Sequence, residues 1–340
     1  MAAGSERPPG RHRRTLRLVA LVAVLVVVAV GGAVALTHPD DDLPLRIGPE
    51  AHGGVLSNGC SFSPRGLPTC GAYVGAAYGG NTDPATLEAE AGGLLGVRRT
   101  FWRPTQVAAA VTTAREDLAA GRLPWISFKL PLSWDEMASG DGDDWALGIA
   151  TALSRLPGPV WIAFHHEPEG EGDTEDWRRM QEHLAPLVRA TARNVAFTVI
   201  LTGFHQLFGD PAWSLEEAWP QDTTIDVAAF DIYTDYGTVK GDRVVSEWPD
   251  LGDDWFRPLA AWAREQGVAW GLAETGVTDE AFAREPGLIG ENFADLRAEG
   301  GIAFSYFDSP LNTPASYQLL DPAKLADFAG VLGQGARLPD

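Results

Sequence analysis

Short apolar runs alternate with amphipathic stretches along most of this chain. Each run is rich in Val, Ile, Phe, Ala or Trp and is short enough for a buried strand, and a Gly or Pro commonly precedes it. We predict eight such strands, at residues 72–78, 97–102, 124–129, 160–165, 195–202, 225–233, 268–274 and 302–307.

Helical patterns separate these runs. We predict helices at residues 83–95, 105–120, 145–156, 175–193, 255–266, 291–298 and 322–331. The helix expected in the long aromatic segment 204–224 is the least well marked. Short strands separated by helices indicate a parallel sheet covered by helices. Eight repeats in one domain predict a closed (β/α)8 TIM barrel. An open Rossmann sheet is disfavoured because no Gly-x-Gly-x-x-Gly spacing follows the first strand.

The N-terminus carries an export signal. Arg11, Arg13, Arg14 and Arg17 lie in a basic segment, residues 1–17, and residues 18–36 form an uncharged apolar run. Nineteen such residues can span a bilayer with the arginines on the cytoplasmic side. A cleaved signal peptide has the same polarity, and Ala33–Ala35 offers a small-residue cleavage site. In either case we expect the remainder at the outer face of the cell membrane or secreted.

A polar, Pro- and Asp-rich linker is expected at residues 37–55, and the barrel at 56–340. Cys60 and Cys70 are the chain's two cysteines. In an oxidising compartment we expect them to form a disulfide at the entrance to the domain. Two thiols without nearby histidines would leave a zinc ion half-coordinated, so a metal site is not expected there.

Charge limits the partners of this protein. The 340 residues include 46 acidic and 26 basic side chains, a formal net charge of −20. Phosphate binding needs clustered Lys and Arg, so nucleic acid and anionic membrane surfaces are not expected partners. Membrane contact is expected through the N-terminal segment only. A neutral glycan is compatible with this charge.

Two glutamates end apolar runs about a hundred residues apart. Glu167 follows the run from Val160, in VWIAFHHEPEG. Catalytic groups of a barrel lie where its strands end. His165 and His166 are adjacent in an extended segment and so point to opposite sides, which disfavours a shared metal ion. A helix-capping or salt-bridged loop glutamate is the alternative interpretation of Glu167.

Glu274 ends the run VAWGLAE, and we expect the chain to turn away at Thr275 and Gly276. A charged carboxylate there is costly unless it is paired or solvated at the mouth of the barrel. Tyr233, at the end of the preceding strand, could reach it with its hydroxyl. A buried structural ion pair is the alternative interpretation of Glu274.

Together these residues resemble the retaining glycoside hydrolases of clan A, which are (β/α)8 barrels. That clan places its acid/base glutamate after strand four and its nucleophile after strand seven, where Glu167 and Glu274 stand. Most clan families have Asn before the acid/base, and family 26, the β-mannanase-type family, has His, as at His166. Two differences are Pro168-Glu169-Gly170 in place of Met-Asn-Gly, and Tyr306-Phe307 where the clan commonly has a tryptophan.

The resemblance implies an exported endo-acting retaining glycoside hydrolase that cleaves a β-linked polysaccharide, with β-1,4-mannan as one substrate. Glu274 would be the nucleophile and Glu167 the acid/base. We expect no cofactor, no metal, and a monomer whose partner is the polysaccharide or an oligosaccharide. Two alternatives are a barrel that binds sugar without catalysis, and a metal-dependent hydrolase that uses His165, His166 and Asp231.

Aromatic side chains stack on sugar rings with little entropic cost. We predict that Trp102, Tyr233 and Tyr306 line the cleft, and that Asp231 and His166 bind sugar hydroxyls or orient the glutamates. Weaker candidates are Trp134, Trp161, Trp213, Trp219 and Asp308. The acidic run Glu167, Glu169, Glu171 and Asp173 indicates either a calcium site or, as we expect, a solvated loop.

Overall fold

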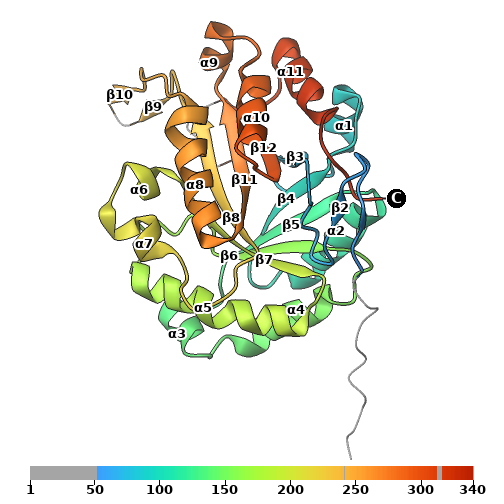
Figure 1. Ribbon diagram of the computed structural model, residues 1–340, viewed down its shortest axis with the longest axis vertical. Helices are drawn as coiled ribbons and strands as arrows, with labels where there is room; N and C mark the ends of the chain where they lie inside the picture. The colour runs from blue at the N-terminus through green and yellow to red at the C-terminus, as the bar shows by residue number, and fades with distance from the viewer. Residues whose placement is uncertain (1–51, 241, 312–315, 340) are drawn as a thin grey trace, which may run out of the picture. The chain divides into compact units, whose positions relative to one another are not determined.

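A computed structural model describes residues 52–240, 242–311 and 316–339. Eight parallel strands close into a barrel in the order β11-β12-β3-β4-β5-β6-β7-β8 (Figure 1). The predicted (β/α)8 barrel is therefore confirmed. Its strands are β3 (Tyr73–Tyr78), β4 (Val97–Trp102), β5 (Leu123–Phe128), β6 (Val160–Phe164), β7 (Val195–Leu201), β8 (Val227–Thr234), β11 (Ala269–Val277) and β12 (Ala303–Asp308).

The seven predicted helices are present, with shifted ends. They are α1 (Ala85–Ala91), α2 (Val107–Ala119), α4 (Asp143–Leu153), α5 (Thr174–Thr191), α8 (Arg257–Gln266), α10 (Leu288–Ala298) and α11 (Pro322–Leu332). The segment 204–224, where one poorly marked helix was expected, holds three short helices: α6 (Phe204–Leu207), η1 (Pro211–Trp213) and α7 (Leu215–Ala218). Other short elements were not predicted, because six residues or fewer show too little periodicity. These are α3 (Trp134–Ala138), β9 (Val239–Lys240), β10 (Arg243–Val244), the π-helical turn η2 (Leu251–Phe256) and α9 (Asp279–Arg284).

Both faces of the barrel strands are apolar, which explains the continuous apolar runs. Ile126 and Phe128 of β5 face outward into the core beneath the helices. Trp125 of the same strand faces inward and packs edge-on against Trp161 of β6, with ring centroids 4.9 Å apart. Buried parallel strands therefore lack the polar alternation of a half-exposed sheet.

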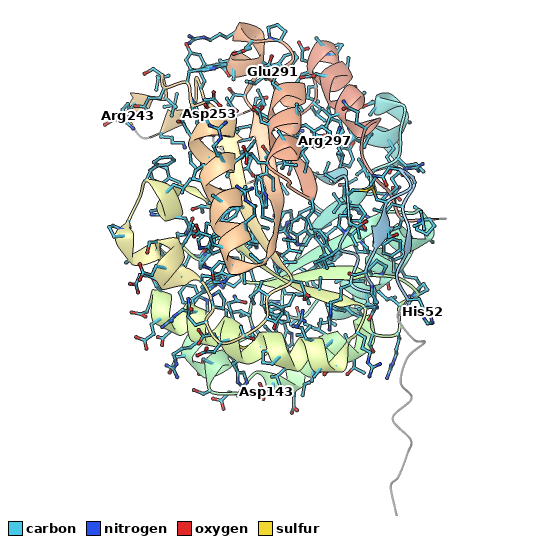
Figure 2. All side chains as sticks on the ribbon, in the orientation of Figure 1. His52, Asp143, Arg243, Asp253, Glu291 and Arg297 are labelled. Carbon is cyan, nitrogen blue, oxygen red and sulfur yellow. A yellow bond between two sulfur atoms is a disulfide. The ribbon has the colours of Figure 1, made fainter. Side chains whose placement is uncertain are left out.

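The segment before β3 closes the N-terminal end of the barrel. Strands β1 (Gly54–Val55) and β2 (Ser61–Phe62) form a hairpin, and the predicted Cys60–Cys70 disulfide is confirmed (yellow in Figure 2). The Tyr73 hydroxyl donates to the Gly66 carbonyl at 2.9 Å. With this end covered, the opposite, C-terminal end is free to carry a site.

The N-terminal predictions fall almost wholly outside the described residues. This holds for the basic segment 1–17, the apolar segment 18–36 and most of the linker 37–55. Within the described part of the chain, no helix combines the length and apolar character needed to cross a bilayer.

Strand β11 extends past its predicted end. Leu272 pairs with Phe230 of β8, yet Glu274 pairs with Asp231, so β11 holds one extra residue, Ala273, at this point. Such a bulge bends a strand and re-aims the neighbouring side chain. The chain then continues in the strand to Val277. The predicted turn at Thr275 is therefore wrong, and Glu274 lies within the strand.

Candidate active site

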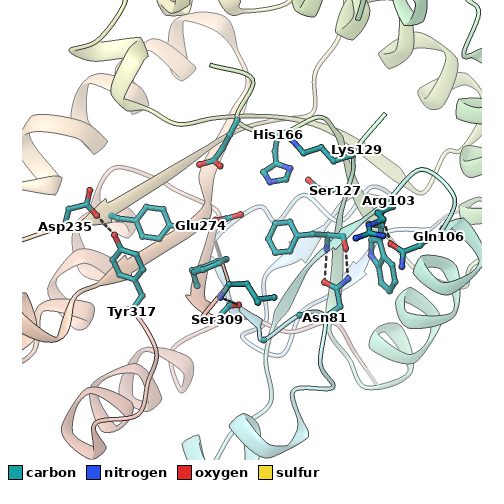
Figure 3. A pocket seen from close by; sticks show the side chains of 18 of the residues that line it. Asn81, Arg103, Gln106, Ser127, Lys129, His166, Asp235, Glu274, Ser309 and Tyr317 are labelled. Atoms are coloured by element: carbon teal, nitrogen blue, oxygen red, sulfur yellow. Dashed lines mark hydrogen bonds between the residues drawn. The ribbon is translucent and has the colours of Figure 1, made fainter. Parts of the chain in front are cut away.

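A pocket of about 920 Å³ opens at the C-terminal end of the barrel (Figure 3). Its lining comes from seven of the eight barrel strands and the loops after them, with β7 contributing no residue. Glu167, just after β6, and Glu274, within β11, both line it. The two glutamates singled out in the sequence therefore meet in one cavity.

The turn after β6 is conformationally strained. His165 and Glu167 both have the left-handed backbone, with φ of 55° and 50°, that residues other than glycine rarely adopt. Backbone bonds hold this turn: the Glu167 N–H donates to the Ile200 carbonyl at 3.1 Å, and the His165 N–H to that of Phe128 at 2.9 Å. Strain of this kind collects at functional sites. Here it presents Glu167 to the pocket.

The environment of Glu167 favours the protonated acid. Burial, and then the charge of Glu274, raises the pKa of Glu167 to about 8, while Arg99 and Lys129 oppose the shift. A carboxylic acid with a pKa near neutrality can hold a proton and donate it.

Glu274 is also buried, with 6% of its surface exposed, but it is better equipped to carry charge. The Tyr233 hydroxyl donates to its Oε2 at 2.5 Å, as we expected from the sequence. Burial raises the pKa of Glu274, whereas the Arg99 guanidinium and the Tyr233 hydrogen bond lower it. The positive charge of Arg99 and the Tyr233 hydroxyl therefore both favour the ionised form of Glu274.

Neighbouring rings hold Tyr233 in place. Its ring lies 4.7 Å from that of Tyr317 and 6.2 Å, edge-on, from that of Phe307. Gly276 makes this arrangement fit, because a Cβ at that position would lie 2.9 Å from Tyr317 and 3.0 Å from Tyr233. The phenol is thus fixed with its hydroxyl toward Glu274.

Sequence reasoning missed Arg99, which lies under the pocket. It is fully buried in β4, and its Nη1 donates to Ser127 Oγ at 2.8 Å. Its guanidinium lies 4.7 Å from the ring centroid of Phe101. Its Nε and Nη2 have no hydrogen-bond partner among the described residues. The available signal was the charged pair Arg98-Arg99 in an otherwise apolar strand, where one arginine had to face inward.

His166 and Asp231 both lie near the glutamates, but only His166 lines the pocket. His166 lines the pocket and packs against Phe101, with ring centroids 5.3 Å apart. Burial and Arg99 lower the pKa of His166 well below its usual range, so its ring is neutral. Asp231 is buried below the pocket lining. Burial, Glu274 and Glu167 raise the pKa of Asp231 well above its usual range.

Two of the three aromatic residues predicted to line the cleft do line the pocket. Trp102 and Tyr233 line the pocket, as predicted. Tyr306 does not: its side chain is fully buried, its hydroxyl donates to the Tyr317 carbonyl at 2.8 Å, and its ring packs against Phe328 of α11. Successive residues of a strand face opposite sides, and Phe307 lines the pocket in its place. The assignment of Tyr306 to the cleft is therefore corrected.

The weaker candidates lie outside this pocket. Trp161 fills the barrel interior and Asp308 accepts from the Leu319 N–H at 3.0 Å. Trp134, Trp213 and Trp219 are buried, and the first donates to Nδ1 of His165 at 3.1 Å. These tryptophans are packing residues of the barrel and its loops.

The acidic residues after β6 each contact a different partner. Glu169 accepts from the Thr202 N–H at 2.9 Å, Glu171 bonds His165 Nε2 at 2.7 Å, and Asp173 caps α5. His165 thus faces Glu171 and a second cavity, while His166 faces the main pocket. The described residues contain no group of three or more His, Cys, Asp or Glu side chains placed to bind a metal ion.

Among known proteins, solved structures resemble this chain in fold. No family model matches the chain, and no curated protein matches it. The cellulose synthase subunit Z of Clostridioides difficile shares 14% identity over 77% of this chain and 99% of its own, with a TM-score of 0.57. Cel5A of Thermotoga maritima, solved with mannotriose, shares 12% sequence identity over 74% of this chain and 90% of its own, with a TM-score of 0.54. At these identities the likeness extends to the barrel fold.

Proposed function

We propose that this protein is a retaining glycoside hydrolase that cleaves a β-linked polysaccharide. One observation carries the proposal. Glu167, just after the fourth barrel strand, and Glu274, within the seventh, line the same pocket and lie close enough for Glu274 to shift the pKa of Glu167. A carboxylic acid paired with a carboxylate is the arrangement used to cleave glycosidic bonds.

In the first step, the Glu274 carboxylate attacks the anomeric carbon, and the bond from this carbon to the glycosidic oxygen breaks. Glu167 gives its proton to the departing oxygen. The Tyr233 hydroxyl and the Arg99 guanidinium favour the ionised form of Glu274 before the attack. The product is a glycosyl ester on Glu274 and a released sugar chain.

In the second step, Glu167, now a carboxylate, takes a proton from water as the water oxygen attacks the anomeric carbon. The ester bond breaks and Glu274 leaves as a carboxylate. The loss of the neighbouring negative charge on Glu274 in the intermediate lowers the pKa of Glu167, because that charge had raised it. The same residue can therefore act first as acid and then as base.

The finer assignment is part of the same proposal. His166 before Glu167 favours a family 26-like enzyme. Cel5A of Thermotoga maritima, described as an endoglucanase and solved with mannotriose, shares the fold, and so supports β-glucans and β-mannans as substrates to test. We propose an exported protein that acts as a monomer, because one chain supplies both glutamates and the pocket around them.

A polysaccharide screen tests this function. The purified protein is incubated with β-1,4-mannan, β-1,4-glucan, mixed-linkage β-glucan and xylan, and new reducing ends are measured. We expect release from at least one of them, lost in the Glu274→Gln variant. Release that survives in this variant would contradict the proposal.

A further inference from the structure

The walls of the pocket are unusually basic for this chain. Acidic side chains outnumber basic ones 46 to 26 over the whole sequence, yet three basic residues, Arg103, Lys129 and Lys240, line the pocket beside three carboxyl groups. The sequence contains only three lysines, and two of them are here. The third, Lys324, is buried and bonds Asp279 at 2.9 Å.

One of the three cations has a local partner. Lys240 forms an ion pair with Asp235, which also accepts from the Tyr317 hydroxyl. Asp235 and Tyr317 lie on the opposite side of the pocket from Arg103 and Lys129, with Glu274 between them (Figure 3). The charge of Lys240 is balanced within the protein.

Arg103 has no such partner. Its side chain is exposed to the pocket, and within the described ranges its guanidinium makes no hydrogen bond or ion pair. Its backbone N–H donates to Gln106 Oε1 at 2.9 Å. This contact leaves the amide nitrogen of Gln106, another pocket residue, available as a donor beside the arginine.

Lys129 is only weakly engaged. Its Nζ lies 3.4 Å from both carboxylate oxygens of Glu171 and 3.5 Å from His165 Nε2, and the Lys129 and Glu171 side chains are about half exposed. Exposed pairs of this kind stabilise a fold little. Its charge also lowers the pKa of Glu167, which opposes the proposed role of that acid. Neither stability nor tuning of the acid therefore accounts for a lysine at this position.

The sheet register places the backbones of these two residues next to each other. Trp102 of β4 pairs with Phe128 of β5, and the Lys129 N–H donates to the Trp102 carbonyl at 2.9 Å. Arg103 and Lys129 are therefore the next residues on neighbouring parallel strands. Like charges at such positions repel each other. An anion bound between them would remove the repulsion. The planar guanidinium of an arginine can donate two parallel hydrogen bonds to the oxygens of a carboxylate, sulfate or phosphate group.

We propose that the substrate is an anionic glycan, whose carboxylate, sulfate or phosphate group binds Arg103 and Lys129, with Gln106 as an additional donor. This inference rests on the proposed glycosidase function and specifies its substrate class. The surface carries net negative charge, but salt screens it beyond about 8 Å at physiological ionic strength.

Matched substrates test the proposal. We would compare β-1,4-glucuronan with β-1,4-glucan oligosaccharides, and β-1,4-mannuronan with β-1,4-mannan oligosaccharides, which differ only at C6. A 6-O-sulfated β-1,4-glucan oligosaccharide separates sulfate from carboxylate recognition. The readouts are kcat/KM and, by calorimetry on the Glu167→Gln variant, the Kd. The protein variants are Arg103→Gln and Lys129→Gln, with Arg115→Gln on the exposed face of α2 as the matched control.

We expect a charged substrate to be preferred over its neutral partner, and each pocket substitution to reduce this preference about 10- to 100-fold, the range of a charge-assisted hydrogen bond. Arg115→Gln should retain the preference. Preference for the neutral partners, or a preference unchanged by both pocket substitutions, would overturn the inference while leaving the glycosidase function intact. Arg103-dependent binding without cleavage of any substrate would support the inference and refute the function. No binding of any charged oligosaccharide would overturn the inference.

Discussion

The Tyr233 hydroxyl donates a hydrogen bond of 2.5 Å to Oε2 of Glu274, across the pairing of β8 with β11. The bulge at Ala273 shifts the register there, so that Glu274 pairs with Asp231, two residues before Tyr233. The bond stabilises a buried carboxylate in its charged form. A nucleophile that attacks as an anion depends on such a donor.

Replacing Tyr233 with Phe removes this donor and keeps the ring between Tyr317 and Phe307. We expect kcat/KM to fall about 10- to 100-fold, because a hydrogen bond to a charged group contributes about 1.5–3 kcal/mol. The pKa of Glu274 should rise, so the acidic limb of the pH–rate profile should move to higher pH. Tyr236→Phe, outside the pocket lining, is the matched control. Equal losses in the two variants would refute a specific role for the Tyr233 hydroxyl.

The pKa of Glu167, about 8, predicts the alkaline limb of the pH–rate profile. The general acid must be protonated, so activity should be retained below this value and lost as the pH rises through it. The Glu167→Gln variant cannot titrate at this position. With an aryl glycoside whose leaving group needs no proton, its alkaline limb should disappear. If the alkaline limb persists in Glu167→Gln, it arises from the titration of another group, and its assignment to Glu167 is wrong.

Replacing each of the two glutamates with alanine should affect activity in a different way. Glu167→Ala should abolish hydrolysis of natural glycans but spare the first step for an activated aryl glycoside, and added azide should restore turnover by attacking the glycosyl-enzyme. Glu274→Ala should abolish both activities, because no ester can form. Glu90→Ala, on the exposed side of α1, controls for removal of a surface carboxylate. Near-normal activity of Glu274→Ala would refute the assignment.

Asp117 should be important for stability. Its carboxylate, 1% exposed, accepts from Arg98 at 3.0 Å and from Arg122 at 3.3 Å. Asp117→Ala leaves two buried cations without this partner, and we expect a loss of about 3–5 kcal/mol in the free energy of unfolding. Chemical denaturation measures it, with the exposed Asp141→Ala as control. A loss below about 1 kcal/mol, the level of an exposed pair, would contradict this account.

The apolar pattern predicted the strands well because barrel strands are buried on both faces. The same property hid which residues face inward, so Tyr306 was assigned to the cleft although Phe307 lines it. Glu167 and Glu274 were found because a carboxyl group at the end of an apolar run stands out. Their partner Arg99 was missed because it lies inside a strand, three residues before that strand ends. The bulge at Ala273 has no sequence signature of its own.

The central claim is that Glu274 becomes covalently linked to the sugar, and the anomeric configuration of the first product tests it most directly. A nucleophile requires carboxyl groups about 5–5.5 Å apart, and two displacements at the anomeric carbon then restore its configuration. Proton NMR follows the cleavage of a β-linked oligosaccharide before mutarotation equilibrates the product. We predict that the β-anomer appears first. An α-anomer appearing first would mean a single displacement by water, and would contradict the proposed role of Glu274.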